Sequence, residues 1–268
     1  YGNKTVQNYK LAANGQILSL NNPMGKTWAI IIENTEYKDF QTLISPVKDM
    51  VSLEDALGKY KFSKILHKKN MTKREMEKFF SIELRDEVRA RKIKSLVIWF
   101  AGHGKFINEV GYWIPVDARR DEEFTYYSLT TLRASMESYM NYLTHVLVIT
   151  DACESGPSFY QAMRSDLKVR NCADWRATQF KSSQVFSSAG YELAVDDSQF
   201  TRTFASALRG NPKTCIAIEE IALQVTKAVS QNNQQKPKFG KITGLKDEDG
   251  TFFFIKKWPD RSATRRYQ

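Results

Sequence analysis

Short apolar runs of strand character alternate with amphipathic helical segments along the chain, and this alternation limits its fold more than any other sequence feature. Helical periodicity of apolar residues spans 45–60, 72–91, 128–140, 198–210 and 215–230. Strand-like runs lie between and beyond these helices, at 28–33, 63–69, 95–100, 145–150, 184–190 and 251–257. Such an order predicts an α/β fold with a mostly parallel central sheet of about six strands and helices on both faces.

The length and apolar content suit a globular chain. With 268 residues and 42% hydrophobic residues, a substantial core can be buried. No apolar run approaches the roughly 18 residues of a membrane span, and the first residues lack the apolar core of a signal peptide. Because the chain begins with Tyr1, we expect a fragment or processed form, with residues 1–26 as an N-terminal extension or linker from upstream sequence.

Two of the apolar strands end in residues that carry chemistry. One leads into Gly102, His103 and Gly104, and another into "DACESG", which contains Cys153. Reacting groups gather at the carboxyl ends of parallel strands, so we expect His103 and Cys153 to meet there. An imidazole can take a thiol proton, and the thiolate then attacks a carbonyl carbon. The pair predicts peptide hydrolysis through a thioester, with the backbone N–H groups of Gly104 and Cys153 as the oxyanion hole.

We predict no catalytic role for the remaining histidines and cysteines. We interpret His67 and His145 as surface or strand-edge residues, and Cys172 and Cys215 as small buried hydrophobes. Three cysteines without metal-ligand spacing predict neither a disulfide framework nor a metal site, and a cytoplasmic location fits them.

The net charge of +10 raises nucleic acid as a partner, since clustered Lys and Arg neutralise phosphates. The basic residues are spread along the chain, however, and no nucleic-acid-binding module accompanies them. We therefore predict a solvated basic surface, with nucleic acid disfavoured as a partner and no membrane association.

The motifs resemble those of the caspase-like cysteine peptidases (peptidase family C14), specifically the metacaspase-like and bacterial branch. "DACESG" is similar to the D-x-C-x-S-G form of that branch, and a histidine roughly 50 residues upstream is the family's spacing. The segments "IIIENTEYKDFQTLISPVKDM", "GYWIPVDA", "SSAGYELAVDDSQFTRTFASAL" and "QQKPKFG" also resemble family segments. The resemblance implies a caspase-like three-layer sandwich over residues 27–257, with 258–268 as a C-terminal tail.

The resemblance also implies a substrate preference. Metacaspases line the pocket for the residue before the scissile bond with acids, and Asp49 and Asp151 match two of them. A carboxylate pairs with a guanidinium in two parallel hydrogen bonds, so cleavage after Arg or Lys is implied. Ala101 stands where metacaspases carry serine, and a surface carboxylate on a helix is the alternative interpretation of Asp49.

The long connection after Cys153 suggests self-processing. In the family the chain is often cut there, and five basic residues of the 157–181 segment would suit a basic-specific enzyme: Arg164, Lys168, Arg170, Arg176 and Lys181. The resemblance leaves calcium activation open, but neither "AVDDSQ" nor "KDEDG" has the spacing of a calcium loop, so no cofactor is predicted.

Two kinds of function remain open from the sequence. The first is an endopeptidase that acts on a protein or peptide substrate, with an upstream regulatory domain or an activating partner. The alternative is a catalytically idle caspase-like interaction or scaffold domain, because folds persist after their sites are lost.

Overall fold

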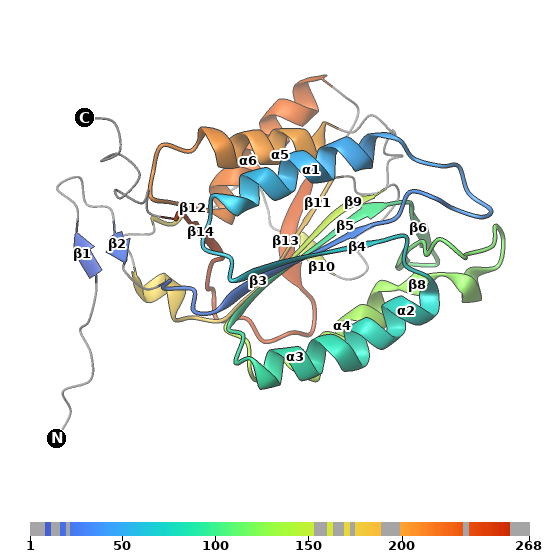
Figure 1. Cartoon of the computed structure of the whole chain (residues 1–268), viewed down its shortest axis with the longest axis horizontal. Helices are drawn as coiled ribbons and strands as arrows, with labels where there is room; N and C mark the ends of the chain where they lie inside the picture. Colours follow the sequence, from blue (N-terminus) through green and yellow to red (C-terminus); the bar gives the residue numbers. More distant parts are fainter. Residues whose placement is uncertain are drawn as a thin grey trace, which may run out of the picture.

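A seven-stranded sheet forms the centre of the computed structural model, with strand order β10-β13-β11-β9-β5-β3-β4 (Figure 1). The structure describes residues 9–11, 17–19, 22–152, 160–162, 169–171, 175–188, 199–232 and 236–257. The sheet strands are β3 (Thr27–Glu33), β4 (Lys64–Lys69), β5 (Ser95–Gly102), β9 (His145–Ala152), β10 (Tyr160–Ala162), β11 (Ser182–Ser187) and β13 (Lys238–Ile242). All neighbours from β4 to β11 pair in parallel, and β13 runs antiparallel to β11 and β10. The predicted mostly parallel α/β sheet is confirmed.

Helices cover both faces of this sheet and make a three-layer sandwich (Figure 1). One face carries α1 (Ser45–Gly58), α5 (Phe200–Gly210) and α6 (Ile218–Asn232). The opposite face carries α2 (Lys73–Lys78), α3 (Leu84–Ala90) and α4 (Leu129–Glu137). Three smaller sheets pair β1 (Tyr9–Leu11) with β2 (Ile17–Ser19), β12 (Cys215–Ala217) with β14 (Phe253–Ile255), and β6 (Gly104–Ile107) with β7 (Val110–Trp113) and β8 (Tyr127–Ser128).

The central strands are buried on both sides, because alternate side chains point into different helix layers. In β5, Val97 and Trp99 join the apolar cluster beneath α1, α5 and α6, whereas Ile98 and Phe100 join the cluster on the α2–α4 side. Every residue of β3 and β5 is buried, which explains why these strands read as unbroken apolar runs.

The helical segment predicted at 72–91 is interrupted. Thr72 and Glu75 form the expected capping box at its start, with Thr72 N–H donating to Glu75 Oε2 over 2.8 Å. Between α2 and α3, however, the chain forms a π-helix, η1 (Phe79–Glu83), which the period of the apolar residues did not reveal. Shorter 3-10 turns occur at η2 (Glu123–Thr125) and η3 (Trp175–Thr178).

Several other predictions need correction. The helix predicted from Cys215 begins at Ile218, because residues 215–217 pair with β14 as a strand. Cys215 is disulfide-bonded, so an odd cysteine count did not exclude a disulfide. His145 is fully buried in β9, whereas His67 does lie on the outer strand β4.

His67 nevertheless has a mostly buried side chain, and it connects three elements. Its Nε2 lies 2.8 Å from Glu33 Oε2 at the end of β3, and its Nδ1 lies 2.7 Å from Glu54 Oε1 on α1. Because the Glu33 carboxylate is buried, it benefits from the positive charge of Lys69, whose Nζ lies 3.8 Å from Glu33 Oε2. The network anchors the chain where β3 ends and the next connection begins.

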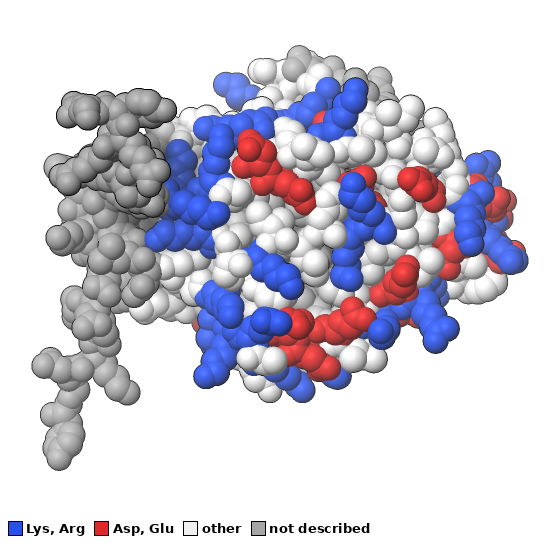
Figure 2. Space-filling model, viewed as in Figure 1, with Lys and Arg blue, Asp and Glu red and all other residues white. Residues whose placement is uncertain are grey.

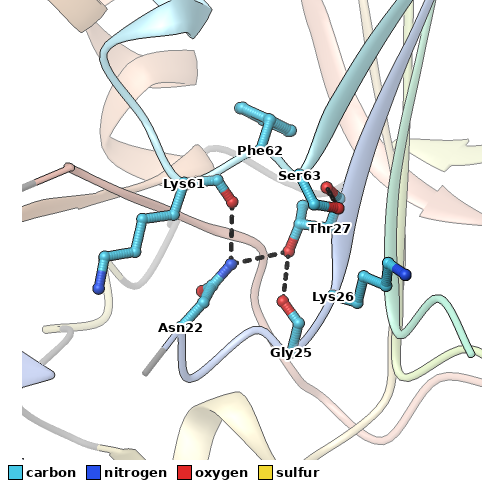
Figure 3. A pocket seen from close by; sticks show the side chains of 7 residues that line it. All are labelled: Asn22, Gly25, Lys26, Thr27, Lys61, Phe62 and Ser63. Atoms are coloured by element: carbon cyan, nitrogen blue, oxygen red, sulfur yellow. Dashed lines mark hydrogen bonds between the residues drawn. The ribbon is translucent and has the colours of Figure 1, made fainter. Parts of the chain in front are cut away.

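A cavity of about 390 Å³ lies at the amino end of β3, close to Thr27 (Figure 3). Its lining residues are joined by hydrogen bonds, since Asn22 Nδ2 donates to Thr27 Oγ1 and to the Lys61 carbonyl oxygen, both over 3.0 Å. This cavity opens at the opposite end of β3 from Glu33, so it is remote from the residues that the sequence analysis singled out.

The charged residues on one face of the molecule are mixed in sign, with Lys and Arg alternating with Asp and Glu (Figure 2). Lys and Arg gather more densely on the left of the described surface in this view. Among the described helices, none has both the length and the hydropathy that a membrane span requires.

Candidate active site

His103 directly follows β5 at the carboxyl edge of the sheet, and neighbouring groups hold both its backbone and its ring. Its backbone N–H donates to Tyr37 Oη over 2.8 Å, and its Nε2 lies 2.7 Å from the carbonyl oxygen of Gln41. A carbonyl oxygen can only accept, so Nε2 carries the hydrogen and Nδ1 is the acceptor nitrogen of the neutral ring. The imidazole is therefore set in one tautomer, with the proton-accepting nitrogen on the side away from Gln41.

Tyr37 and Gln41 belong to the connection between β3 and α1, which Asn34 fixes at its start. Asn34 is fully buried; its Nδ2 donates to the carbonyl oxygens of Met71 and Ile114, and its Oδ1 accepts from Met71 N–H over 2.8 Å. The Tyr37 ring lies beside the imidazole, with centroids 4.7 Å apart. Asn34 and Tyr37 both belong to the segment "IIIENTEYKDFQTLISPVKDM", which therefore helps to position His103.

Gly102 is needed for close packing rather than for an unusual backbone angle. A Cβ atom there would lie 2.5 Å from Tyr37 Oη and 3.1 Å from the Asn34 carbonyl oxygen. The described glycines with positive φ are Gly25 and Gly244, so neither Gly102 nor Gly104 has the left-handed backbone that favours glycine. Gly104 instead begins β6, where it pairs with Trp113.

The two predicted pocket acids approach the same turn of α5 from different elements. Asp151 is the penultimate residue of β9, and its Oδ2 accepts a 2.6 Å hydrogen bond from Thr201 Oγ1. Asp49, on α1, is only 7% exposed, and its Oδ1 lies 3.6 Å from Arg202 Nε. Asp49 is therefore a buried, paired carboxylate rather than a solvated one on the helix surface.

The parallel pairing of β5 with β9 brings the predicted reacting segments to one edge. Gly102 pairs with Ala152, the last residue of β9. Cys153 comes next in the sequence and lies outside the described residues, so its side chain and its backbone N–H are not part of this geometry.

Comparison with known proteins identifies the family. The caspase domain model matches residues 26–246. The chain belongs to the caspase-domain family. Among solved structures, it is similar to caspase-1 from Spodoptera frugiperda, with a TM-score of 0.56 and 14% identity, over 81% of this chain and 86% of that one. None of the curated proteins compared with it gives a significant match.

Within this caspase domain, the basic residues proposed for self-processing have different placements. Arg164 and Lys168 lie outside the described residues, Arg170 is partly exposed, and Arg176 falls in η3. Lys181 is held in place: its Nζ donates to the carbonyl oxygens of Met140 and Leu143 over 3.0 and 2.9 Å, just before β11. We therefore omit Lys181 from the cleavage positions proposed below.

The aspartates of "KDEDG" in this caspase domain already contact other groups of the protein. Asp247 and Asp249 both contact Lys241 Nζ, and Asp247 Oδ2 also accepts from Ser183 N–H over 2.8 Å. The described residues contain no group of three or more side chains suited to holding a metal ion, and "AVDDSQ" lies almost entirely outside them.

Sequence reasoning missed the groups that hold the candidate residues of this caspase domain. Gln41 acts through its backbone carbonyl, which carries no side-chain signature, and Thr201 and Arg202 are far from Asp151 and Asp49 in the sequence. Only the segment "IIIENTEYKDFQTLISPVKDM", which contains Tyr37 and Gln41, gave a signal, because it resembled a family segment.

Proposed function

We propose that this caspase domain is a cysteine endopeptidase in which His103 and Cys153 form a catalytic dyad. The observation that carries the proposal is the contact of His103 Nε2 with the Gln41 carbonyl oxygen, which sets Nδ1 as the proton acceptor at the carboxyl edge of the sheet. Cys153 follows Ala152, the residue paired with Gly102, so chain connectivity keeps the cysteine close to that edge.

The chemistry follows from these two groups. His103 Nδ1 takes the Cys153 thiol proton, and the thiolate sulfur forms a bond to the carbonyl carbon of the substrate. The backbone N–H groups of Gly104 and Cys153 donate to the resulting oxyanion. The imidazolium returns its proton to the leaving amine as the C–N bond breaks, and water then hydrolyses the thioester, releasing the acid and restoring the thiol.

The proposed substrates carry Arg or Lys before the scissile bond. Support comes from Asp49 and Asp151, which reach neighbouring residues of α5 at the same edge of the sheet. Protein or peptide chains are thus the proposed substrates, and Arg164, Lys168, Arg170 and Arg176 the proposed self-cleavage positions.

Single and double variants test the dyad. Cys153→Ala and His103→Ala should each abolish peptide hydrolysis, and the double variant should lose little more, because the two residues act as one unit. Wild-type protein should also react at Cys153 with a peptidyl electrophile that ends in arginine. Independent, additive losses would contradict the dyad, and an unreactive Cys153 would favour the idle scaffold domain.

A further inference from the structure

Phe40 is a half-buried aromatic residue of the connection between β3 and α1, and its ring packs against the imidazole of His103. The two ring centroids lie 5.9 Å apart, with the planes inclined at 38°. Tyr37, from the same connection, packs against both rings, with its centroid 4.7 Å from that of His103 and 6.1 Å from that of Phe40. The imidazole is therefore one member of a group of three rings at separations typical of aromatic pairs.

A second segment of the chain holds Phe40 in turn. The ring of Tyr126, a buried residue, meets Phe40 edge-on, with centroids 6.0 Å apart. The Arg120 guanidinium lies over the Phe40 ring, 5.9 Å from its centroid, and the Arg120 backbone N–H donates to Asp39 Oδ2 over 2.8 Å. Phe40 thus links the small apolar cluster that contains Tyr37 and Tyr126 to the imidazole.

These ring contacts add a restraint that the two hydrogen bonds described above do not supply. Tyr37 Oη holds the His103 backbone, and the Gln41 carbonyl oxygen holds Nε2. Rotation of a histidine ring about its Cβ–Cγ bond is broad and roughly two-fold, so packing is needed to keep the ring in one plane. The orientation of that plane decides where Nδ1 points.

We propose that Phe40 is a positioning residue that acts through His103. Its ring keeps the imidazole in the orientation in which Nδ1 can take the Cys153 proton, so the inference rests on the dyad proposed above. Because Phe40 acts on the base and not on the substrate, its loss should slow the chemical step and leave substrate affinity unchanged.

The test replaces Phe40 by leucine, which keeps an apolar side chain without the ring. For a peptide with arginine before the scissile bond, Phe40→Leu should lower kcat by about tenfold and leave KM near the wild-type value, because a misaligned base transfers the proton less well. Phe40→Tyr keeps the ring and should retain the wild-type kcat.

A second measurement follows the imidazole itself and needs no substrate. Nitrogen NMR shifts distinguish a protonated ring nitrogen from an unprotonated one, and the His103→Ala spectrum identifies the His103 signals. At about pH 8.5, well above the ordinary imidazole pKa of about 6.5, wild-type His103 should be a single tautomer with its hydrogen on Nε2. Phe40→Leu should give a mixture, because the ring no longer stays against the Gln41 carbonyl oxygen. Unchanged His67 and His145 signals would show that the variant is folded.

Phe62→Leu is the matched control. Phe62 is also half-buried, lies in the connection between α1 and β4, and has its ring centroid 6.1 Å from that of Phe254. It lines the cavity at the amino end of β3, remote from His103 (Figure 3). The substitution removes a comparable ring contact, so kcat and the His103 signals should equal those of wild type.

The outcomes separate this inference from the function on which it rests. A wild-type kcat and a single His103 tautomer in Phe40→Leu overturn the role of Phe40 and leave the dyad standing. A higher KM with unchanged kcat also overturns it, because Phe40 would then bind substrate. An equal loss of kcat in Phe62→Leu would assign the effect to general destabilisation, against the proposal. If wild type cuts no arginine peptide and Cys153 is unreactive, the dyad fails, while a tautomer mixture confined to Phe40→Leu still supports the hold of Phe40 on the imidazole.

Discussion

The position of His103 depends on atoms that its own sequence motif does not contain. Glycines on both sides of a histidine predicted an edge of the sheet, and the structure places His103 directly after β5. The tautomer, however, is set by the Gln41 carbonyl oxygen, and the backbone by the Tyr37 hydroxyl. Both contacts join residues distant in sequence, so spacing alone could not predict them.

Gly102→Ala should lower kcat/KM by about tenfold or more, because overpacking a tight site displaces its neighbours. The new Cβ would lie 2.5 Å from Tyr37 Oη, which accepts from His103 N–H. Steady-state hydrolysis of an arginine peptide measures the effect. Gly58→Ala is the control, because nothing lies within 4 Å of a Cβ at that glycine. Equal activity of the two variants would show that the Tyr37 contact does not position His103.

At the scale of elements, the buried strands were predictable and the short non-local pairings were not. Continuous apolar runs identified β3, β5 and β9, which are buried on both faces. Residues 215–217 were predicted as helix, because their strand conformation depends on pairing with β14, far along the chain. The buried His145 was missed for a similar reason: its partners come from η3 and β11.

His145 joins β9 to those two elements in its neutral form. Its Nε2 faces the Thr178 carbonyl oxygen at 2.8 Å and therefore donates, while Nδ1 accepts from Ser182 Oγ at 2.7 Å. Burial lowers the pKa of His145 from 6.5 to about 4. Below its ordinary pKa, the unfolded chain takes up a proton that the folded chain does not.

The free energy of unfolding should therefore fall as the pH drops from 6.5 to about 4. The share due to His145 should be on the order of 3 kcal/mol across that window, since each pKa unit corresponds to roughly 1.4 kcal/mol. Urea unfolding at pH 7 and pH 4.5 measures it, with His145→Asn as the comparison because asparagine does not titrate. An equally steep fall in the variant would assign the pH dependence to other groups.

For the whole molecule, the three-layer arrangement follows from the alternation of strands and helices. The order of the strands, in which β3 lies between β5 and β4, was not predicted. The outermost strand β10 was not predicted, because the 157–181 segment is polar and no apolar run identifies residues 160–162 as a strand. β10 pairs with β13, so residues that follow the predicted nucleophile join the sheet at its outer side.

This pairing has a consequence for the proposed self-cleavage. A cut after Arg170 would leave β9 and β10 on one fragment and β11 and β13 on the other. The parallel β9–β11 pairing and the antiparallel β10–β13 pairing then join the two fragments. We expect wild-type protein to give two bands under denaturing conditions and one intact-size peak in gel filtration, whereas Cys153→Ala gives one band. Fragments that separate in gel filtration, or that form equally in Cys153→Ala, would contradict this prediction.

The opposite side of the sheet ends in β4, which carries Lys64, Lys68 and Lys69. Two of their ammonium groups lie over aromatic rings, Lys64 over Trp28 and Lys68 over Phe79, at 4.6 and 4.5 Å from the ring centroids. A second copy approaching that strand to extend the sheet would set like charges against each other. In a concentrated solution, the molecules should repel at this strand, so it is a poor starting point for fibril growth.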